Sequence, residues 1–268
     1  MQYTVNNQML SYTCEGPIEV GPDRVLLKPS QDLTVGKSWS GRGYSIEQLF
    51  SSDTWERFRH EVQSLILGCW RKSGLEVFEN FPLEKYHTLI RNYEDHIAAV
   101  NETKLISTEK FPLGISLIEE RISEIIGTEL RALNPYDNQS VFHFRVIRPG
   151  STDNNPLHRD VWLEDYESCI NLYIPVAGSN PQSSLIICPG SHYWPESKIE
   201  RSKAGAKING VKFNVPAVTS INGDYSFVRP DPKENEVLVF SPYLIHGGAV
   251  NLNEDITRIS IELRLWKK

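Results

Sequence analysis

The pattern of apolar and polar residues changes about halfway along the chain. Before residue 140, apolar residues recur at the three- and four-residue spacings of amphipathic helices. The stripe from Leu117 to Ile126 is typical of a helix face packed in a core. The first forty or so residues instead mix short extended pieces with turns. The expected helices cover residues 45–74, 82–100 and 112–133.

After residue 140 the pattern is one of short strands. Runs rich in β-branched and aromatic residues alternate with clusters of Gly, Pro, Asn and Ser, without helical patterns between them. This disfavours a parallel βαβ sheet and favours an antiparallel sandwich or jelly roll. We therefore predict a mainly β protein with flanking helices (α+β), in which N-terminal helices cover an outer face of the β core. The prediction is a single domain, 1–268, with N-terminal β and helical elements in 1–139 and a jelly-roll core in 140–268.

The composition narrows the classes of function. The formal net charge of −6 disfavours a general nucleic-acid or anionic-membrane binder. No run approaches the roughly 18 apolar residues of a membrane span, and the first residues lack the features of a signal peptide. The four cysteines are scattered without a C-x-x-C pair, which predicts reduced thiols and disfavours zinc sites built from cysteine pairs. We expect a cytoplasmic protein that acts on a small molecule, with its oligomeric state left open.

Candidate metal ligands lie in the β-rich half. The stretch "NPLHRDVW" places His158 and Asp160 two residues apart at a loop-to-strand junction, and residues two apart on a strand point the same way. Alone, this pattern most often marks a solvated edge. His246, at the end of the apolar run in "SPYLIHGGAVN", completes a set of two imidazoles and one carboxylate. Such a set leaves the other positions of the ion open, as non-haem Fe(II) oxygenases require.

The last predicted strand, "ITRISIELRLW", has one apolar and one polar face. A polar face normally meets water, but inside a small barrel it can line a ligand site. A chelating keto acid such as 2-oxoglutarate needs its far carboxylate held, and arginine does this best through two parallel hydrogen bonds. The polar face carries Arg258, Ser260, Glu262 and Arg264, of which Arg258 and Ser260 are the candidates for this role.

Together these motifs resemble the Fe(II)/2-oxoglutarate-dependent oxygenases similar to phytanoyl-CoA hydroxylase. "HRD" looks like the first two metal ligands, and "HGGAVN" looks like the third ligand followed by the family's asparagine, here Asn251. "RIS" looks like the carboxylate clamp, and "PGSH", ending at His192, resembles the family's glycine-serine-histidine turn. The motifs occur in the family's order across roughly the C-terminal half of the chain.

The resemblance implies a double-stranded β-helix, a cupin-like jelly roll, that uses Fe(II), 2-oxoglutarate and O₂. His158, Asp160 and His246 would hold the iron, and Arg258 with Ser260 would hold 2-oxoglutarate. Asn171 would either lie near the co-substrate or be a polar group of the core. The implied reaction couples 2-oxoglutarate decarboxylation to hydroxylation of a small organic substrate. Asp160 favours hydroxylation, because family members that halogenate carry a small residue in its place.

Two other interpretations stay open. A cupin-like metalloenzyme or isomerase would use the same three ligands without 2-oxoglutarate, and would not need Arg258 or Ser260. A non-catalytic jelly-roll binding module would take up no stoichiometric metal. Among the other histidines, His192 is expected to be structural, His96 to be a surface or packing residue, and His143 to have no role at the site.

The segment 193–216 is richer in basic residues than the chain as a whole. A basic segment is often only a solvated loop, but long loops in compact domains are frequently lids or binding loops. Its positive charge would attract a substrate that carries a carboxylate, phosphate or sulfate group. The sequence thus predicts an anionic substrate, with Lys203 and Lys207 as the candidate contacts.

Overall fold

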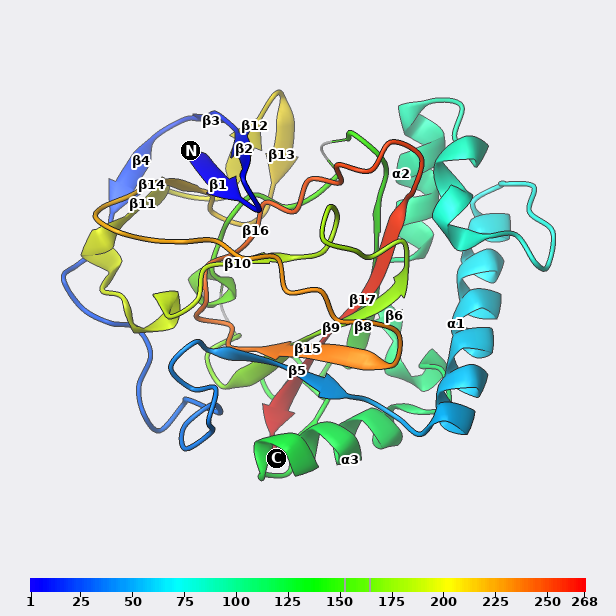
Figure 1. Ribbon diagram of the computed structural model, residues 1–268, viewed down its shortest axis with the longest axis horizontal. Helices are drawn as coiled ribbons and strands as arrows, with labels where there is room; N and C mark the ends of the chain where they lie inside the picture. Colours follow the sequence, from blue (N-terminus) through cyan, green and yellow to red (C-terminus); the bar gives the residue numbers. More distant parts are fainter. Residues whose placement is uncertain (152, 164) are drawn as a thin grey trace.

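A seven-stranded antiparallel sheet forms the centre of the molecule (Figure 1). The structure is a computed structural model that describes residues 1–268 except 152 and 164. Six strands follow the order β5-β15-β9-β17-β8-β6, and β7 pairs with the end of β17. Their bounds are β5 Tyr44–Gln48, β6 Ile106–Ser107, β7 Leu130–Arg131, β8 Val141–Ile147, β9 Cys169–Ala177, β15 Glu236–Phe240 and β17 Arg258–Lys267.

A second ladder of short strands packs against the inner face of this sheet. Its centre is the pair β10 (Ile186–Ile187) and β16 (His246–Gly247). Isolated bridges extend it, from His246 to His158 on one side and from Ile187 to Val228 on the other. The main order β8-β17-β9-β15 and this second ladder of four segments are the two sheets of a jelly roll. The predicted double-stranded β-helix is confirmed.

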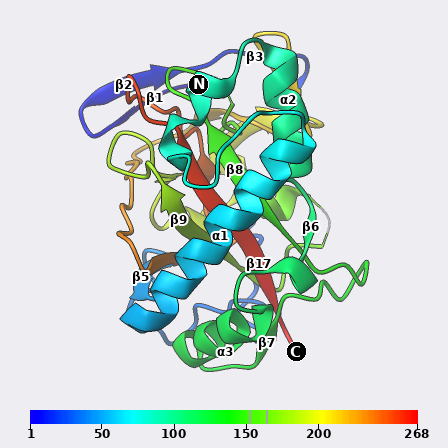
Figure 2. The same cartoon turned by 90° about the vertical axis from the view of Figure 1, so that its right-hand side faces the viewer.

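Alternation along the strands builds two cores, one on each face of the main sheet. On β15, Val239 lies in the outer core and Leu238 in the inner one. The outer core is closed by α1 (Ser52–Lys72) and α3 (Ile115–Ile126), and Figure 2 shows α1 crossing this face of the sheet. Each fully buried aliphatic side chain contributes about 1.5–3 kcal/mol to this packing. The predicted cover of helices is confirmed, and among the described residues no helix is long and apolar enough to cross a membrane.

The helix boundaries differ from those predicted. Residues 45–48, expected to be helical, belong to β5 (Tyr44–Gln48), because the open edge of β15 provides backbone partners for them. The second expected helix is two elements, a 3-10 helix at Leu83–Leu89 and α2 at Tyr93–Glu102, since the Asn92 side chain caps α2 by accepting from the Asp95 N–H at 2.9 Å. The third ends at Gly127, whose left-handed backbone stops α3. Further 3-10 turns lie at Thr108–Lys110, Asp160–Trp162, Ser191–Tyr193 and Glu196–Lys198.

The basic segment 193–216 is not the loop that was expected. It forms strands that pair with the N-terminal part of the chain, and Lys207 forms an ion pair with Glu15 at 2.7 Å. Strands from both halves of the chain therefore pair with one another, and the proposed boundary near residue 140 stays a prediction. The small sheets are β1 (Gln2–Val5) with β2 (Gln8–Ser11), β14 (Val218–Ile221) with β11 (Ile199–Ser202) and β4 (Ile18–Val20), and β13 (Val211–Phe213) with β12 (Ala206–Ile208) and β3 (Cys14–Glu15).

Candidate metal centre

The two histidines of the predicted triad lie directly opposite each other. Each donates its backbone N–H to the carbonyl of the other, at 2.8 and 2.9 Å, and their ring centroids are 4.4 Å apart. Asp160 follows at the start of a 3-10 turn, with its N–H bonded to the Pro242 carbonyl at 3.1 Å. The expectation that one regular strand aims His158 and Asp160 at the same point is wrong. The bridge and the turn bring the three side chains together instead.

Both imidazoles are oriented by backbone carbonyls. Nδ1 of His158 is 2.7 Å from the Pro156 oxygen, and Nδ1 of His246 is 2.9 Å from the Leu244 oxygen. A carbonyl only accepts, so Nδ1 carries the proton of the neutral ring and Nε2 presents a lone pair. Burial, and then the neighbouring His158, lower the pKa of His246 to about 4, which keeps it neutral at pH 7.

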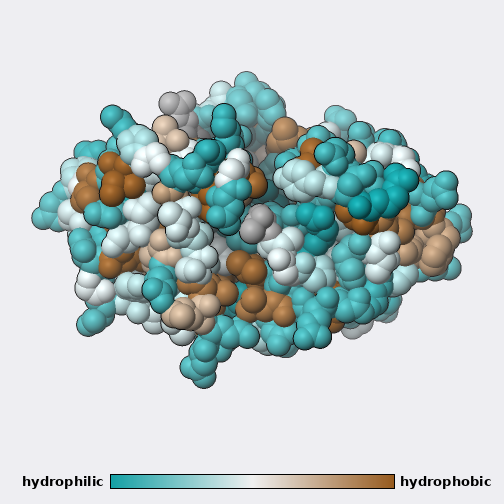
Figure 3. All heavy atoms as spheres, turned by 90° about the horizontal axis from the view of Figure 1, so that it is seen from above, coloured by the Kyte–Doolittle hydropathy of each residue, from teal (hydrophilic) through white to brown (hydrophobic). Residues whose placement is uncertain are grey.

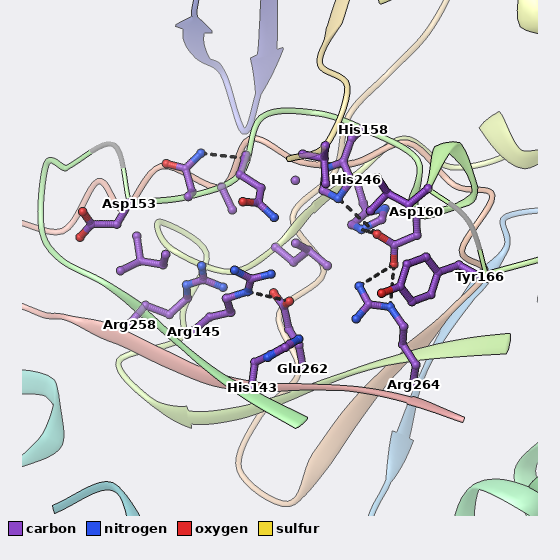
Figure 4. Close-up of a pocket in the computed structure, with 18 residues that line it drawn as sticks. His143, Arg145, Asp153, His158, Asp160, Tyr166, His246, Arg258, Glu262 and Arg264 are labelled. Carbon is purple, nitrogen blue, oxygen red and sulfur yellow. Dashed lines mark hydrogen bonds and ion pairs between the residues drawn. The ribbon is translucent and has the colours of Figure 1, made fainter. Parts of the chain in front are cut away.

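These lone pairs converge on one carboxylate oxygen (Figure 4). Oδ1 of Asp160 lies 3.3 Å from Nε2 of His158 and 3.7 Å from Nε2 of His246. One ligand atom from each of the three buried residues lies within 4.8 Å of the others, a spacing that allows all three to bind one ion. The donor set of two imidazoles and one carboxylate fits a divalent transition metal such as Fe(II).

The other oxygen of Asp160 is fully engaged by the protein. Oδ2 accepts from Nε and Nη2 of Arg264, at 3.1 and 2.9 Å, and from the Asn171 amide at 2.9 Å. Burial alone would raise the pKa of Asp160, but Arg264 and the two histidines outweigh it and hold that pKa well below its usual value. Asp160 is therefore an ionised carboxylate with one oxygen free toward the histidines. Asn171 acts on this carboxylate, and the sequence alone had not suggested this contact.

Arg258 is a buried cation with little to neutralise it. Its side chain lines the same cavity as the triad, is 2% exposed, and has Nη1 3.5 Å from the Ser260 hydroxyl. Among the described residues no carboxylate lies within ion-pair distance of Arg258, and its buried Nε has no hydrogen-bond partner. A buried guanidinium without a counter-ion is costly, so this geometry favours a ligand that supplies a carboxylate. Ser260 lies beside Arg258 and is not itself part of the cavity wall.

The cavity that joins the triad to Arg258 has a volume of about 150 Å³. Arg145 and His143 on β8 also line it, so His143 faces inward with Arg145 and not outward as expected. On the neighbouring strands Arg145 lies opposite Ser260, and His143 opposite Glu262, so the inward polar face continues from β17 onto β8. Nε of Arg145 is 2.7 Å from Oε2 of Glu262. Burial and then Arg145 lower the pKa of His143 to about 3, so this imidazole is neutral.

Arg159, the middle residue of the H-R-D motif, anchors the metal-binding segment. It is fully buried and forms an ion pair with Glu196, which also accepts from the Trp162 indole at 2.8 Å. Arg159 additionally donates to the Ser191 carbonyl. Glu196, an acidic residue of the basic segment, thus ties that segment to the metal-binding turn. The sequence showed Arg159 only as part of the motif, without this role.

The glycine-serine-histidine turn supports the third ligand from behind. The Ser191 hydroxyl donates to the Cys188 carbonyl at 2.7 Å and accepts from the Ile245 N–H at 2.8 Å, next to His246. His192 is fully buried, with Nε2 2.9 Å from the Ser40 carbonyl. This contact agrees with the structural role expected for His192. Asn251 is likewise structural in its contacts, since its amide donates to two backbone carbonyls.

No protein-family model and no curated protein sequence matches this chain. Among solved structures, it is similar to EctD from S. alaskensis with 2-oxoglutarate and 5-hydroxyectoine (13% identity, TM-score 0.48, covering 96% of this chain and 86% of EctD). It is also similar to AviO1 from Streptomyces viridochromogenes Tue57 (16% identity, TM-score 0.47, covering 91% and 97%). A third is SnoK, a non-heme alpha ketoglutarate dependent carbocyclase from nogalamycin biosynthesis (14% identity, TM-score 0.46, covering 92% and 87%). We base the function of this chain on the residues of its own cavity.

Proposed function

We propose that this protein is a non-haem Fe(II) dioxygenase that couples decarboxylation of 2-oxoglutarate to hydroxylation of a small, anionic organic substrate. One observation carries the proposal: the buried, unneutralised Arg258 shares a cavity with the convergent ligands His158, Asp160 and His246. A metalloenzyme or isomerase that does not use 2-oxoglutarate would have no need of this guanidinium. A binding module without metal would have no need of two Nε2 lone pairs directed at one carboxylate oxygen.

In this proposal each side chain has a defined task. His158 and His246 would hold Fe(II) through Nε2, and Asp160 through Oδ1. When bound, the metal supplies the activation of O₂ and the oxidising power of the reaction. Arg264 and Asn171 keep Asp160 ionised and oriented, so Asn171 would serve the metal site through this carboxylate.

Arg258 would hold the far carboxylate of 2-oxoglutarate, and Ser260 would position the guanidinium of Arg258. The guanidinium of Arg258 lies over the ring of Tyr173, with its carbon 5.6 Å from the ring centroid. Because Arg258 is buried, an ion pair with 2-oxoglutarate would be stronger there than at the surface. The carboxylate at Asp160 occupies the third protein position on the metal, which supports hydroxylation as the outcome.

The free thiols support a location in the cytoplasm. All four cysteines are unpaired, and three of them are buried. Reduced cysteines are typical of proteins that stay in a reducing compartment.

The proposal is tested by adding Fe(II) and 2-oxoglutarate to the metal-free protein under anaerobic conditions. We expect the weak visible charge-transfer absorption of the chelate in the wild type, and its loss in Asp160→Ala. Arg258→Met should require a much higher concentration of 2-oxoglutarate for the same absorption. Absence of the absorption in the wild type at saturating metal and 2-oxoglutarate would contradict the proposal.

A further inference from the structure

A second cavity opens beside the metal cavity and leads to the surface. Its volume is about 430 Å³, and it is bounded by α2, by β8 and by residues 211–215 of the β12–β13 hairpin. We call it the outer groove. The molecular face seen in Figure 3 is hollowed near its middle, and Figure 1 shows the hairpin and α2 on either side of this region. The two cavities share six wall residues: His143, Arg145, Ile147, Asp153, Asn155 and Val215.

The outer groove has apolar walls that are open to solvent. Tyr93 and Leu105 line it and are 52% and 64% exposed. Ile97 and Val100 on α2 continue the same walls. Exposed apolar surface that is gathered in a concave site is a mark of ligand binding.

His96 ties this groove to the metal-binding segment. It is buried, as expected of a packing residue, and it also lines the groove. Its Nε2 is 3.3 Å from Asp153, and its Nδ1 is 3.1 Å from the Tyr86 hydroxyl. Asp153 also accepts from Nε of Arg148 at 2.9 Å. The carboxylate of Asp153 is therefore neutralised by the protein and does not repel an anion in the groove.

Two lysines add positive charge to the walls of the groove. Lys104 follows α2 directly, and Lys212 lies on β13. Among the described residues, neither forms an ion pair, whereas the neighbouring Arg145 is neutralised by Glu262. Partial burial, with a smaller effect from Arg145, lowers the pKa of Lys104 from its usual value. The groove thus combines apolar walls with two positive charges.

The volumes of the two cavities determine which part of a substrate molecule fits in each of them. The metal cavity, at about 150 Å³, is smaller than the roughly 300–1,000 Å³ of a site that encloses a drug-sized ligand. In the proposed function it also holds 2-oxoglutarate. Only the reacting end of a substrate can then enter it, and the rest must lie in the outer groove.

We propose that the substrate is an elongated amphiphilic anion whose body lies in the outer groove. Its apolar part contacts Tyr93 and Leu105, and its carboxylate or phosphate lies near Lys104 and Lys212. The carbon to be oxidised reaches past Arg145 into the metal cavity. This inference rests on the proposed function for the identity of the reacting end. It replaces Lys207 as the anion contact, because Lys207 already pairs with Glu15.

The test is calorimetric titration of the metal-free protein without 2-oxoglutarate, so that it does not depend on the oxygenase chemistry. The probes are octyl phosphate, octanoate, octan-1-ol, octyltrimethylammonium and inorganic phosphate. We expect octyl phosphate or octanoate to bind more tightly than octan-1-ol or inorganic phosphate alone. The octyltrimethylammonium cation should not bind measurably, since the lysines repel it.

The variant is Lys104→Gln with Lys212→Gln, and its matched control is Lys28→Gln with Lys203→Gln, two other exposed lysines that lie outside the groove. The Lys104→Gln, Lys212→Gln variant should bind the anionic probes about three- to tenfold more weakly than the wild type. This is the affinity expected from two partly exposed ion pairs. The control should bind them like the wild type. Equal weakening in both variants, unchanged binding in the first, or equal binding of the cationic probe would overturn the proposal. If the wild type shows the charge-transfer absorption but does not bind the anionic probes, this inference is refuted and the proposed function stands.

Discussion

Arg264 donates from both Nε and Nη2 to Oδ2 of Asp160, at 3.1 and 2.9 Å, on the side of the carboxylate that faces away from the histidines. Because Oδ2 is occupied, only Oδ1 is available to a metal. The same strand, β17, carries Arg258 six residues earlier on the same inward face. One strand therefore supports the proposed metal ligand Asp160 at one end of the cavity and carries the proposed co-substrate contact Arg258 at the other.

Loss of Arg264 should weaken metal binding. In Arg264→Met, Asp160 loses two hydrogen bonds and its main counter-charge, so we expect the affinity for Mn(II), used as a stable substitute for Fe(II), to fall about 10–100-fold. Asn171→Ala removes one hydrogen bond from the same oxygen and should cause a smaller loss. Calorimetry measures both, and unchanged Mn(II) affinity in Arg264→Met would show that this contact does not orient the ligand.

Substitution of Arg258 should weaken 2-oxoglutarate binding without weakening metal binding. Arg258→Lys keeps the charge but loses the planar pair of donors, so 2-oxoglutarate binding should weaken by about 1–3 kcal/mol while Mn(II) binding stays near that of the wild type. Arg264→Lys is the matched control, since it makes the same substitution on the same face of β17. If Arg264→Lys abolished 2-oxoglutarate binding and Arg258→Lys left it intact, the assignment of the clamp would be wrong.

The histidine ligands should be required for metal uptake but not for folding. His246→Ala and His158→Ala should each abolish measurable Mn(II) binding, because two remaining ligands hold the ion poorly. Both should unfold cooperatively, since the jelly roll is held mainly by apolar burial on the two faces of the main sheet. His143→Ala removes an imidazole from the same cavity and should retain the metal. Equal Mn(II) loss in His143→Ala would point to a different ligand set.

The Arg145–Glu262 ion pair should make stability depend on pH. Burial alone would raise the pKa of Glu262, but Arg145 and Arg264 lower it to about 2. Because the folded-state pKa lies below the unfolded value of about 4.3, the pair stabilises the fold fully above that pH and loses this effect as the pH falls toward 2. The contribution at pH 7 is on the order of 3 kcal/mol.

Glu262→Gln should therefore be less stable than the wild type at pH 7, and the difference should shrink steadily below pH 4. Urea unfolding at several pH values measures it. A constant difference from pH 7 to pH 2 would mean that the lost stability comes from packing and not from the charge of Glu262.

Much of the fold could be predicted from hydrophobic periodicity. The strand-rich half, the jelly roll and the cover of helices follow from alternation and from the spacing of turns. The place of residues 44–48 could not be predicted, since a five-residue segment becomes a strand here only because β15 offers an open edge. The pairing of β3 with β12 and of β4 with β11 joins segments far apart in the chain. The local hydrophobic pattern of each segment does not indicate which distant strand it pairs with.

Some residues of the site could likewise be predicted from the sequence, and others could not. Residue type and order were enough to expect that His158, Asp160 and His246 converge and that Arg258 lies in the same cavity. The inward direction of His143 and Arg145 could not be predicted, because alternation shows that β8 has a polar face but not whether that face meets water or a cavity. The ion pair of Glu196 with Arg159 was hidden for a related reason, since Glu196 lies in a segment whose overall charge is basic.

The central claim is that the protein reduces O₂ at the triad with 2-oxoglutarate as the co-substrate. The most direct measurement is to supply ¹⁸O₂ to the Fe(II)-loaded protein with 2-oxoglutarate and to analyse the succinate by mass spectrometry. We predict succinate that carries one ¹⁸O atom from the wild type, and none above background from Asp160→Ala. Absence of labelled succinate from the wild-type protein with its metal bound would contradict the account.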